Sequence, residues 1–228
     1  MAAVARPLER LARITFTGPD LADLPDEEPG EVLTLIWPDG HARNFTIRAY
    51  DRARAAVEVD FILHGDAGTA SAWARRARVG QTLWFYGPRV HFVEDREADW
   101  TLLAGDETAL PSIAATLARA PVERRILAFV EVDPAAARRE DVALPPAATL
   151  TWLERQVPAH ASRELERAVR AAPLPPGRGK VWLAGEAGVV RGLRTYLRDE
   201  RELAIGPQQA VGYWKHRDTP DDVEGDLR

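Results

Sequence analysis

The chain has 228 residues, of which 46% are hydrophobic and 29% are charged, and its formal net charge at pH 7 is −5. This length suits one large domain or two small ones, the composition is that of a globular protein, and the acidic balance argues against a nucleic-acid partner. The absence of cysteine excludes disulfide scaffolds, thiolate metal sites and cysteine nucleophiles, so redox chemistry would need a bound cofactor.

Residues 1–98 are predicted to form a β domain. Short β-branched and aromatic segments alternate there with turns rich in Gly, Pro and Asp, which is typical of an antiparallel barrel or sandwich. One helix is predicted at Ser71–Arg78. The predicted strands are Arg10–Thr17, Glu31–Trp37, Arg43–Arg48, Ala56–His64 and Gln81–Tyr86.

Residues 99–228 are predicted to form an α/β domain, because strand and helix patterns alternate at the spacing of βαβ units with a parallel sheet. The predicted strands are Asp99–Ala104, Arg125–Val132, Ala148–Glu154, Lys180–Ala184 and Gln208–Lys215. The predicted helices are Thr108–Arg119, Ser162–Ala171 and Glu186–Glu200, with a short helical turn at Pro134–Arg139. We therefore expect two domains that divide near residue 98.

The segment Arg43–Arg48 combines groups that a flavin could use. Strand alternation would place Arg43, Phe45 and Ile47 on one face, with Thr46 on the other. A cation suits the pyrophosphate, a hydroxyl suits the ring nitrogen N5, and an aromatic side chain suits the ring. The plain alternative is an amphipathic strand with exposed arginines.

A second segment runs from Phe61 through His64 and Asp66 to the helix at Ser71. A strand, a glycine loop and a capped helix present free backbone N–H groups, so the segment could cradle a pyrophosphate. The alternative is an ordinary strand–turn–helix connection in which Ser71 is the N-cap and His64 is a structural hydrogen bonder.

Two glycine turns follow strands of the α/β domain, one at Gly105 and one at Gly185. If their strands are neighbours, both turns would frame the crevice in which a dinucleotide binds to an open parallel sheet. Asp106 and Glu107 would repel a pyrophosphate, so we expect them to bond backbone amides or to cap the helix. Near the C-terminus, Tyr213 and Trp214 could pack in the core or cover a flat cofactor.

Taken together, these segments resemble the siderophore-interacting protein family, which comprises FAD-dependent ferric-siderophore reductases of the ferredoxin-reductase-like superfamily. The resemblance rests on five segments that follow one another in the family's order: RNFTIR (43–48), VDFILHGDAGTASAWA (59–74), DWTLLAGDETALPSI (99–113), VWLAGEAGVVRGLRTYL (181–197) and GYWK (212–215). The resemblance implies a six-stranded, Greek-key FAD-binding barrel over residues 1–98 and a Rossmann-like NAD(P)H-binding domain over residues 99–228.

The resemblance also implies roles for individual residues. Arg43 would contact the FAD phosphates, Phe45 would flank the flavin, and Thr46 would bond near N5. Where the family usually has tyrosine this chain has Phe45, so a phenol hydrogen bond is missing. The remaining implied FAD contacts are Ile47, His64, Asp66, Ala70, Ser71, Ala72, Thr108, Tyr213 and Trp214, and the NAD(P)H site would comprise Gly105, Asp106, Glu107, Gly185 and Glu186.

The implied activity is NAD(P)H-dependent reduction of a ferric siderophore, with FAD as cofactor and NADPH or NADH as electron donor. No side chain acts as acid, base or nucleophile in this chemistry, and no protein-bound metal is expected. Arg48 and Lys215 could steer an anionic ferric chelate, and Arg155 or Arg191 could meet a 2′-phosphate. We expect a cytoplasmic monomer, since the sequence has neither a membrane span nor a secretory signal.

Two alternatives remain open at this point. One is a flavin reductase that passes electrons to a protein or a quinone. The other is a siderophore or flavin binder without enzymatic activity, whose dinucleotide site has decayed. The intact turns LAGDETALP (103–111) and LAGEA (183–187) argue against decay.

Overall fold

The computed structural model describes residues 1–25, 31–63, 69–90, 95, 97–133, 135, 142–157 and 161–216. The chain divides into two compact units. The first comprises Met1–His91 with Ala135–Arg138, and the second comprises Phe92–Pro134 with Arg139–Arg228. Each unit is described below by itself.

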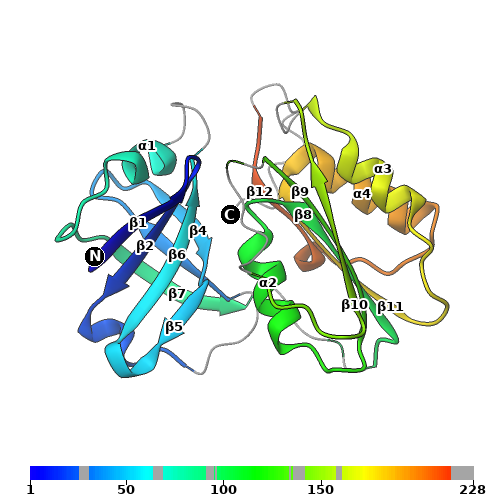
Figure 1. Cartoon of the computed structure of the whole chain (residues 1–228), viewed down its shortest axis with the longest axis horizontal. Helices are drawn as coiled ribbons and strands as arrows, with labels where there is room; N and C mark the ends of the chain where they lie inside the picture. The colour runs from blue at the N-terminus through cyan, green and yellow to red at the C-terminus, as the bar shows by residue number, and fades with distance from the viewer. Residues whose placement is uncertain are drawn as a thin grey trace. The chain divides into compact units, whose positions relative to one another are not determined.

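The first unit is built from two antiparallel sheets, as predicted (Figure 1). One sheet has the strand order β1-β2-β6-β5 and the other has the order β4-β3-β7. The strands are β1 (Ala3–Leu8), β2 (Leu11–Thr17), β3 (Glu31–Ile36), β4 (Ala42–Thr46), β5 (Ala49–Asp51), β6 (Ala56–Ile62) and β7 (Trp84–Val90), and the helices are η1 (Pro19–Leu21), η2 (Arg52–Arg54) and α1 (Thr69–Arg76).

Three strands of this unit, β1, β5 and β7, differ from the sequence prediction. The described residues of the unit form seven strands, where the resemblance implied six. β1 lacks alternating burial and β5 has only three residues, so neither gives a period-two signal. β7 was expected at Gln81–Tyr86 but runs from Trp84 to Val90. Gly87 and Pro88 read as a turn, yet the strand continues through them beside β3 with a register shift.

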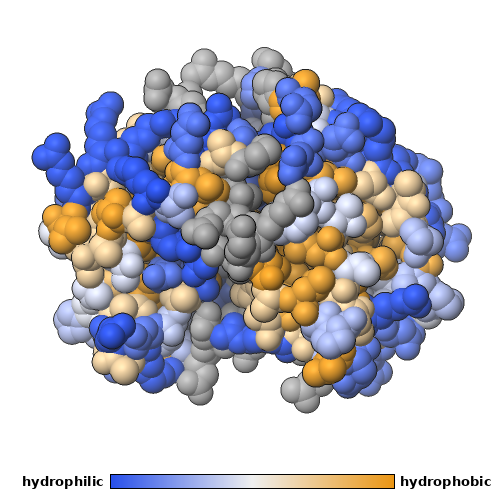
Figure 2. Space-filling model, viewed as in Figure 1, coloured by the Kyte–Doolittle hydropathy of each residue, from blue (hydrophilic) through white to orange (hydrophobic). Residues whose placement is uncertain are grey.

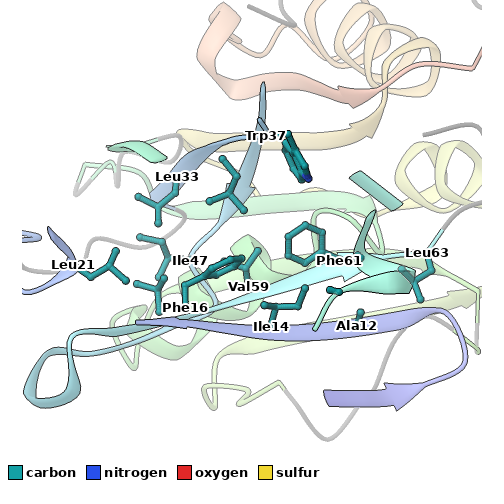
Figure 3. Packing of buried hydrophobic residues seen from close by; sticks show 14 of the residues in the cluster. Ala12, Ile14, Phe16, Leu21, Leu33, Trp37, Ile47, Val59, Phe61 and Leu63 are labelled. Carbon is teal, nitrogen blue, oxygen red and sulfur yellow. The ribbon is translucent and has the colours of Figure 1, made fainter. Parts of the chain in front are cut away.

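The core of the first unit lies between its two sheets. Figure 3 shows Leu33 and Trp37 pointing from one side toward Val59, Phe61 and Ile14 on the other. These five side chains are all at most 3% exposed. Alternation along β2 and β6 places every second side chain in this core, which explains why those strands could be predicted.

The second unit is a parallel five-stranded sheet with the order β10-β9-β8-β11-β12. In Figure 1, α2 lies on one side of the sheet and α3 and α4 lie on the other. The strands are β8 (Trp100–Asp106), β9 (Arg125–Val132), β10 (Ala148–Glu154), β11 (Gly179–Glu186) and β12 (Ala210–Trp214), and the helices are α2 (Leu110–Arg119), α3 (Glu164–Ala171), α4 (Ala187–Asp199) and η5 (Pro207–Gln209).

This strand order confirms the predicted α/β fold. Counted along the chain within this unit, the order is 3-2-1-4-5, the arrangement of dinucleotide-binding sheets, and it reverses between β8 and β11. β9 and β10 have the bounds that the sequence predicts. The predicted helical turn at Pro134–Arg139 falls mostly outside the described residues. In the sheets of this class, ligands bind beyond the carboxyl ends of the strands at the reversal.

Gly179 is required at the start of β11 because the Trp100 ring covers it. A Cβ at Gly179 would lie 2.2 Å from Cζ2 of Trp100, whose side chain is 2% exposed. We expect Gly179→Ala to lower the free energy of unfolding by about 1–3 kcal/mol through overpacking. Urea denaturation tests this. Gly18→Ala is the matched control, since no atom lies within 4 Å of its Cβ position, and an equal loss in both variants would contradict the prediction.

The outer surface of the β4-β3-β7 sheet mixes aromatic and polar side chains. Trp84 and Tyr86 are 68% and 65% exposed. The Arg89 guanidinium lies 6.0 Å from the centroid of the Tyr86 ring and donates to the side-chain oxygens of Thr34 and Asn44, each at 2.9 Å.

The face of the molecule drawn in Figure 2 shows hydrophobic residues in separate patches among hydrophilic ones. Among the described helices, none is both long and apolar enough to cross a membrane.

Candidate functional site

Asp106 ties together the ends of three strands in the second unit. It is the last residue of β8 and is 5% exposed. Its Oδ1 accepts hydrogen bonds from the backbone N–H of Thr108 at 2.9 Å and from the Thr108 hydroxyl. Its Oδ2 accepts from the backbone N–H of Glu186 at 3.0 Å and from the Trp214 indole Nε1 at 2.8 Å. The carboxylate therefore joins the β8 turn, the end of β11 and the end of β12.

The two glycines of the predicted crevice are explained by this packing. At Gly185 the φ angle is +141° and a Cβ would lie 2.7 Å from Asp106 Oδ2. At Gly105 a Cβ would lie 2.4 Å from the carbonyl oxygen of Ala184. Gly105 also pairs with Ala184 in the β8–β11 ladder, so the two turns are neighbours, as the sequence analysis required. Both glycines make room for this chain's own atoms.

Burial and a neighbouring carboxylate change the acidity of Asp106. Desolvation, followed by the charge of Glu107, raises the pKa of Asp106 to about 6, and the bonds from Thr108 and Trp214 offset part of this rise. Asp106 therefore takes up a proton at a pH well above that of an ordinary aspartate.

Glu107 forms a buried ion pair with Arg155, which comes directly after β10. The side chains of Glu107 and Arg155 are 1% and 7% exposed, and the guanidinium donates to both carboxylate oxygens. Burial alone would lower the pKa of Arg155, but the bonds and charge of Glu107 outweigh it and raise that pKa. Glu107 was predicted to bond a backbone amide or cap a helix, and Arg155 was one of two arginines that could meet a 2′-phosphate. In the structure Glu107 and Arg155 bond each other.

Carboxylates also cap the helices that begin at this edge of the sheet. Glu186 is the N-cap of α4 and accepts from the backbone N–H of Val189 at 3.0 Å. Glu131, at the end of β9, accepts from the backbone N–H of Leu165 in α3 at 2.9 Å. Its pKa is raised by burial. Sequence reasoning missed Glu131, although an acid among the apolar residues FVEV at a strand end is an unusual signal.

Asp106, Glu131 and Glu186 surround a small cavity. Its remaining walls are apolar side chains of β8, β11, α3 and α4, among them Leu165 and Leu183. Anions bind helix N-termini because the first backbone N–H groups there lack partners. Here a carboxylate of the chain accepts from one of these N–H groups in each of α3 and α4, and its negative charge disfavours a phosphate at that helix end.

The C-terminal aromatic pair is anchored within the same unit. The Tyr213 hydroxyl lies 3.3 Å from Ser112 Oγ on α2, and the Tyr213 ring stands edge-on to Trp182 with 6.3 Å between centroids. A register shift between β11 and β12 sets Trp214, rather than Tyr213, opposite Glu186. Of the predicted residues of this region, the structure thus brings together Asp106, Thr108, Gly185, Glu186 and Trp214.

In the first unit, Phe45 belongs to a cluster of aromatic rings. Its centroid lies 4.3 Å from that of Phe61 and 6.2 Å from that of Trp37, and Trp73 of α1 lies 5.6 Å from Phe61. Phe45 and Trp73 are only partly buried. The cluster therefore ends in two half-buried aromatic side chains, one on β4 and one on α1.

The other flavin contacts predicted in the described part of this unit lie on β4, directly after it, and in α1. Arg43 is exposed on β4, and Thr46 at the end of that strand is 7% exposed. Ile47 follows the strand and is buried in the core, while Ser71 is buried in the first turns of α1. Ala70 and Ala72 lie beside it and are half-buried. His64 and Asp66 lie outside the described residues.

Arg48 lies in a network of charges on the outer sheet surface. It donates to Glu58 Oε2 at 3.1 Å and lies 3.4 Å from Asp60 Oδ2. Asp60 is also paired with Arg13 through bonds of 2.7 and 2.9 Å. The charge of Arg48 is therefore compensated within the first unit. Lys215, the other predicted steering cation, directly follows β12 and is half-buried.

Comparison with known proteins identifies the family. Residues 98–217 match the siderophore-interacting protein family, and residues 38–92 match its FAD-binding domain. Ferric vibriobactin reductase ViuB of Vibrio cholerae is 30% identical over 91% of this chain and 84% of its own length. The NADPH-dependent ferric-chelate reductase of Escherichia coli is 27% identical over 92% and 81%.

The solved structures agree with this assignment. A siderophore utilization protein from T. fusca superposes with a TM-score of 0.83 and is 30% identical, with 96% of this chain and 92% of that chain covered. The fold, the family match and the 30% identity to ViuB confirm the resemblance that the sequence segments suggested. The chain is a member of the siderophore-interacting protein family.

Proposed function

We propose that the chain is an FAD-dependent NAD(P)H:ferric-siderophore reductase. The observation that carries the proposal is the pairing of a siderophore-interacting FAD-binding domain with a parallel sheet in the strand order of dinucleotide-binding proteins. The names of the relatives, which describe reductases of ferric vibriobactin and of ferric chelates, support the same reaction. In this assignment residues 1–98 bind FAD and residues 99–228 bind the nicotinamide nucleotide.

The residues of the first unit fit a flavin. Phe45 and Trp73 present half-buried aromatic surface, and Arg43 supplies an exposed cation. We assign Arg43, Phe45, Thr46, Ile47, His64, Asp66 and residues 70–72 to FAD. FAD, when bound, converts a two-electron donor into a source of single electrons.

The second unit would receive the nucleotide at the carboxyl edge of its sheet. We assign Gly105, Asp106, Glu107, Gly185 and Glu186 to this site, and Thr108, Tyr213 and Trp214 to the flavin cofactor. Because Asp106 and Glu186 already accept backbone hydrogen bonds, they shape the crevice rather than bind phosphate. Ribose hydroxyls and the carboxamide are the parts of the nucleotide that carboxylates can bond.

The overall reaction balances without an acid or base from the protein. One NAD(P)H is oxidised to NAD(P)⁺ and releases a proton, while two ferric ions each gain one electron and become ferrous. Oxygen-rich siderophores hold ferrous iron far more weakly than ferric iron, so reduction releases the metal. The ferric chelate is the substrate, and we propose that the protein acts as a cytoplasmic monomer.

A ferrous-capture assay tests the proposed activity. The purified protein, loaded with FAD, is supplied with NADPH or NADH, a ferric siderophore and a chromogenic ferrous chelator under anaerobic conditions. We expect coloured complex to form at two ferrous ions per nucleotide oxidised. Nucleotide oxidation that proceeds with a quinone but leaves the ferric siderophore unreduced would reject the proposal in favour of a flavin reductase with another acceptor.

The predicted steering cations can be separated by mutation. We expect Lys215→Ala to raise the KM for an anionic ferric chelate by about two- to fivefold and to weaken its salt dependence. We expect only a small change in this KM for Arg48→Ala, because Glu58 and Asp60 already compensate the charge of Arg48. Steady-state kinetics at two salt concentrations measure both effects. An unchanged KM in the double variant would exclude both residues from steering.

A further inference from the structure

Asp106 forms a hydrogen bond with Trp214, although the two residues are 108 positions apart in the sequence. The indole Nε1–H donates to Oδ2 at 2.8 Å, a length typical of a strong hydrogen bond to a charged acceptor. The Asp106 side chain is held in one orientation, because three further donors from Thr108 and Glu186 bond its two oxygens. The indole is thus bonded to a buried carboxylate whose orientation is fixed.

Two features of the backbone accompany the bond between Asp106 and Trp214. Gly185 lies directly beside Oδ2, where a Cβ would be 2.7 Å away, so the backbone leaves room for Asp106 to reach across β11 toward β12. The register shift between Gly185 and Glu186 brings Trp214, rather than Tyr213, into line with the end of β11. The first feature leaves space for the Asp106 carboxylate, and the second brings Trp214 beside the end of β11.

We propose that Asp106 is a positioning residue that fixes the orientation of the Trp214 indole at the carboxyl edge of the parallel sheet. Its partner Trp214 is half-buried, so one part of the indole is held by the unit and the rest stays accessible to a ligand. This inference rests on the proposed function, in which Trp214 is assigned to the cofactor. Asp106 acts on the reaction through the indole and takes up no proton in it.

The structural part of the proposal is tested without any turnover. The full-length, FAD-loaded protein is labelled with ¹⁵N-tryptophan, and the indole N–H resonances of its seven tryptophans are recorded. Trp214→Phe assigns one of them. We expect that resonance to be shifted by its carboxylate partner and to exchange with solvent more slowly than the indole of Trp84, which is 68% exposed. If the Trp214 indole proton of the unmodified protein exchanges as fast as that of Trp84, the proposal is overturned. This measurement does not require any Asp106 variant to fold.

Two substitutions of Asp106 separate positioning from charge. Asp106→Ala removes the acceptor, so the Trp214 resonance should move and exchange faster. Asp106→Asn keeps one oxygen, which can stay with Trp214 and Glu186. Its amide group loses the bond from the Thr108 backbone N–H and can donate to the Thr108 hydroxyl, so the Trp214 resonance should largely persist. Thr108→Val is the matched control for this spectrum, because it removes a bond to Oδ1 and leaves the Oδ2 contact. An unmoved Trp214 resonance in Asp106→Ala would overturn the inference.

The kinetic part is a double-mutant cycle. We expect Asp106→Ala and Trp214→Phe each to lower kcat for ferric reduction by about tenfold, Asp106→Asn to recover most of it, and the double variant to be no slower than either single variant. If Asp106→Ala slows the reaction equally in the Trp214→Phe background, the residue does not act through the indole. If the unmodified protein reduces no ferric chelate, the proposed function fails, while the indole spectra still decide the contact.

Discussion

Replacing Arg155 by methionine is expected to destabilise the protein by about 3–5 kcal/mol. The substitution leaves the carboxylate of Glu107, which is 1% exposed, without its cation in a buried site. An uncompensated buried charge costs far more than the loss of a surface ion pair. Urea denaturation of the unmodified protein and the Arg155→Met variant measures the difference in unfolding free energy.

Two further variants show whether the cost comes from the isolated carboxylate. The double variant Glu107→Leu with Arg155→Met replaces the pair by apolar side chains and should regain most of the lost stability. Arg198→Met removes an exposed pair with Asp199, whose side chains are 52% and 51% exposed, and should leave the denaturation midpoint unchanged. A midpoint that falls equally in Arg155→Met and Arg198→Met would show that the Glu107–Arg155 pair is not buried as described.

The raised pKa of Asp106 predicts a pH-dependent stability. The folded-state pKa is about 6 and the ordinary value is 3.8, so the folded state holds a proton at pH values where the unfolded state has lost it. The contribution of Asp106 to stability therefore falls as the pH rises from about 4 to about 6, by about 3 kcal/mol in total, and is constant above that range. Asp106→Asn removes this contribution.

The test compares unfolding free energies near about pH 4 and about pH 7.5. Relative to Asp106→Asn, the unmodified protein should gain about 2–3 kcal/mol at the lower pH. Asp199→Asn serves as the control, since its bond with Arg198 lowers the pKa of Asp199 below 3.8 and moves its titration out of this range. A difference between the unmodified protein and Asp106→Asn that stays the same at both pH values would mean that Asp106 is ionised throughout.

The parts of the fold that could be predicted are those governed by local periodicity. β9 and β10 are continuous runs of β-branched and apolar residues between turn signals, and both begin and end where predicted. β2 and β6 alternate clearly between core and surface. β1 and β5 could not be predicted, because their pairing with β2 and β6 is set by tertiary contacts rather than by their own pattern.

In the candidate site too, contacts between near neighbours in the sequence could be predicted and long-range contacts could not. A carboxylate that bonds nearby backbone amides was expected for Asp106 from its place beside a turn, and its bond with Thr108 confirms it. The bond with Trp214 and the pairing of Glu107 with Arg155 join residues 108 and 48 positions apart, which no spacing rule connects. The turn glycines were predicted to frame a dinucleotide crevice, and the structure shows that atoms of Asp106 and Ala184 fill the space beside them.

An absorbance spectrum followed by two anaerobic additions tests the proposed function most directly. The purified protein with FAD should show flavin bands that bleach on addition of NADPH or NADH and return when a ferric siderophore is added. A protein that takes up no FAD would contradict the account. Flavin bands that neither nucleotide bleaches would contradict the assignment of the parallel sheet as the nucleotide-binding unit.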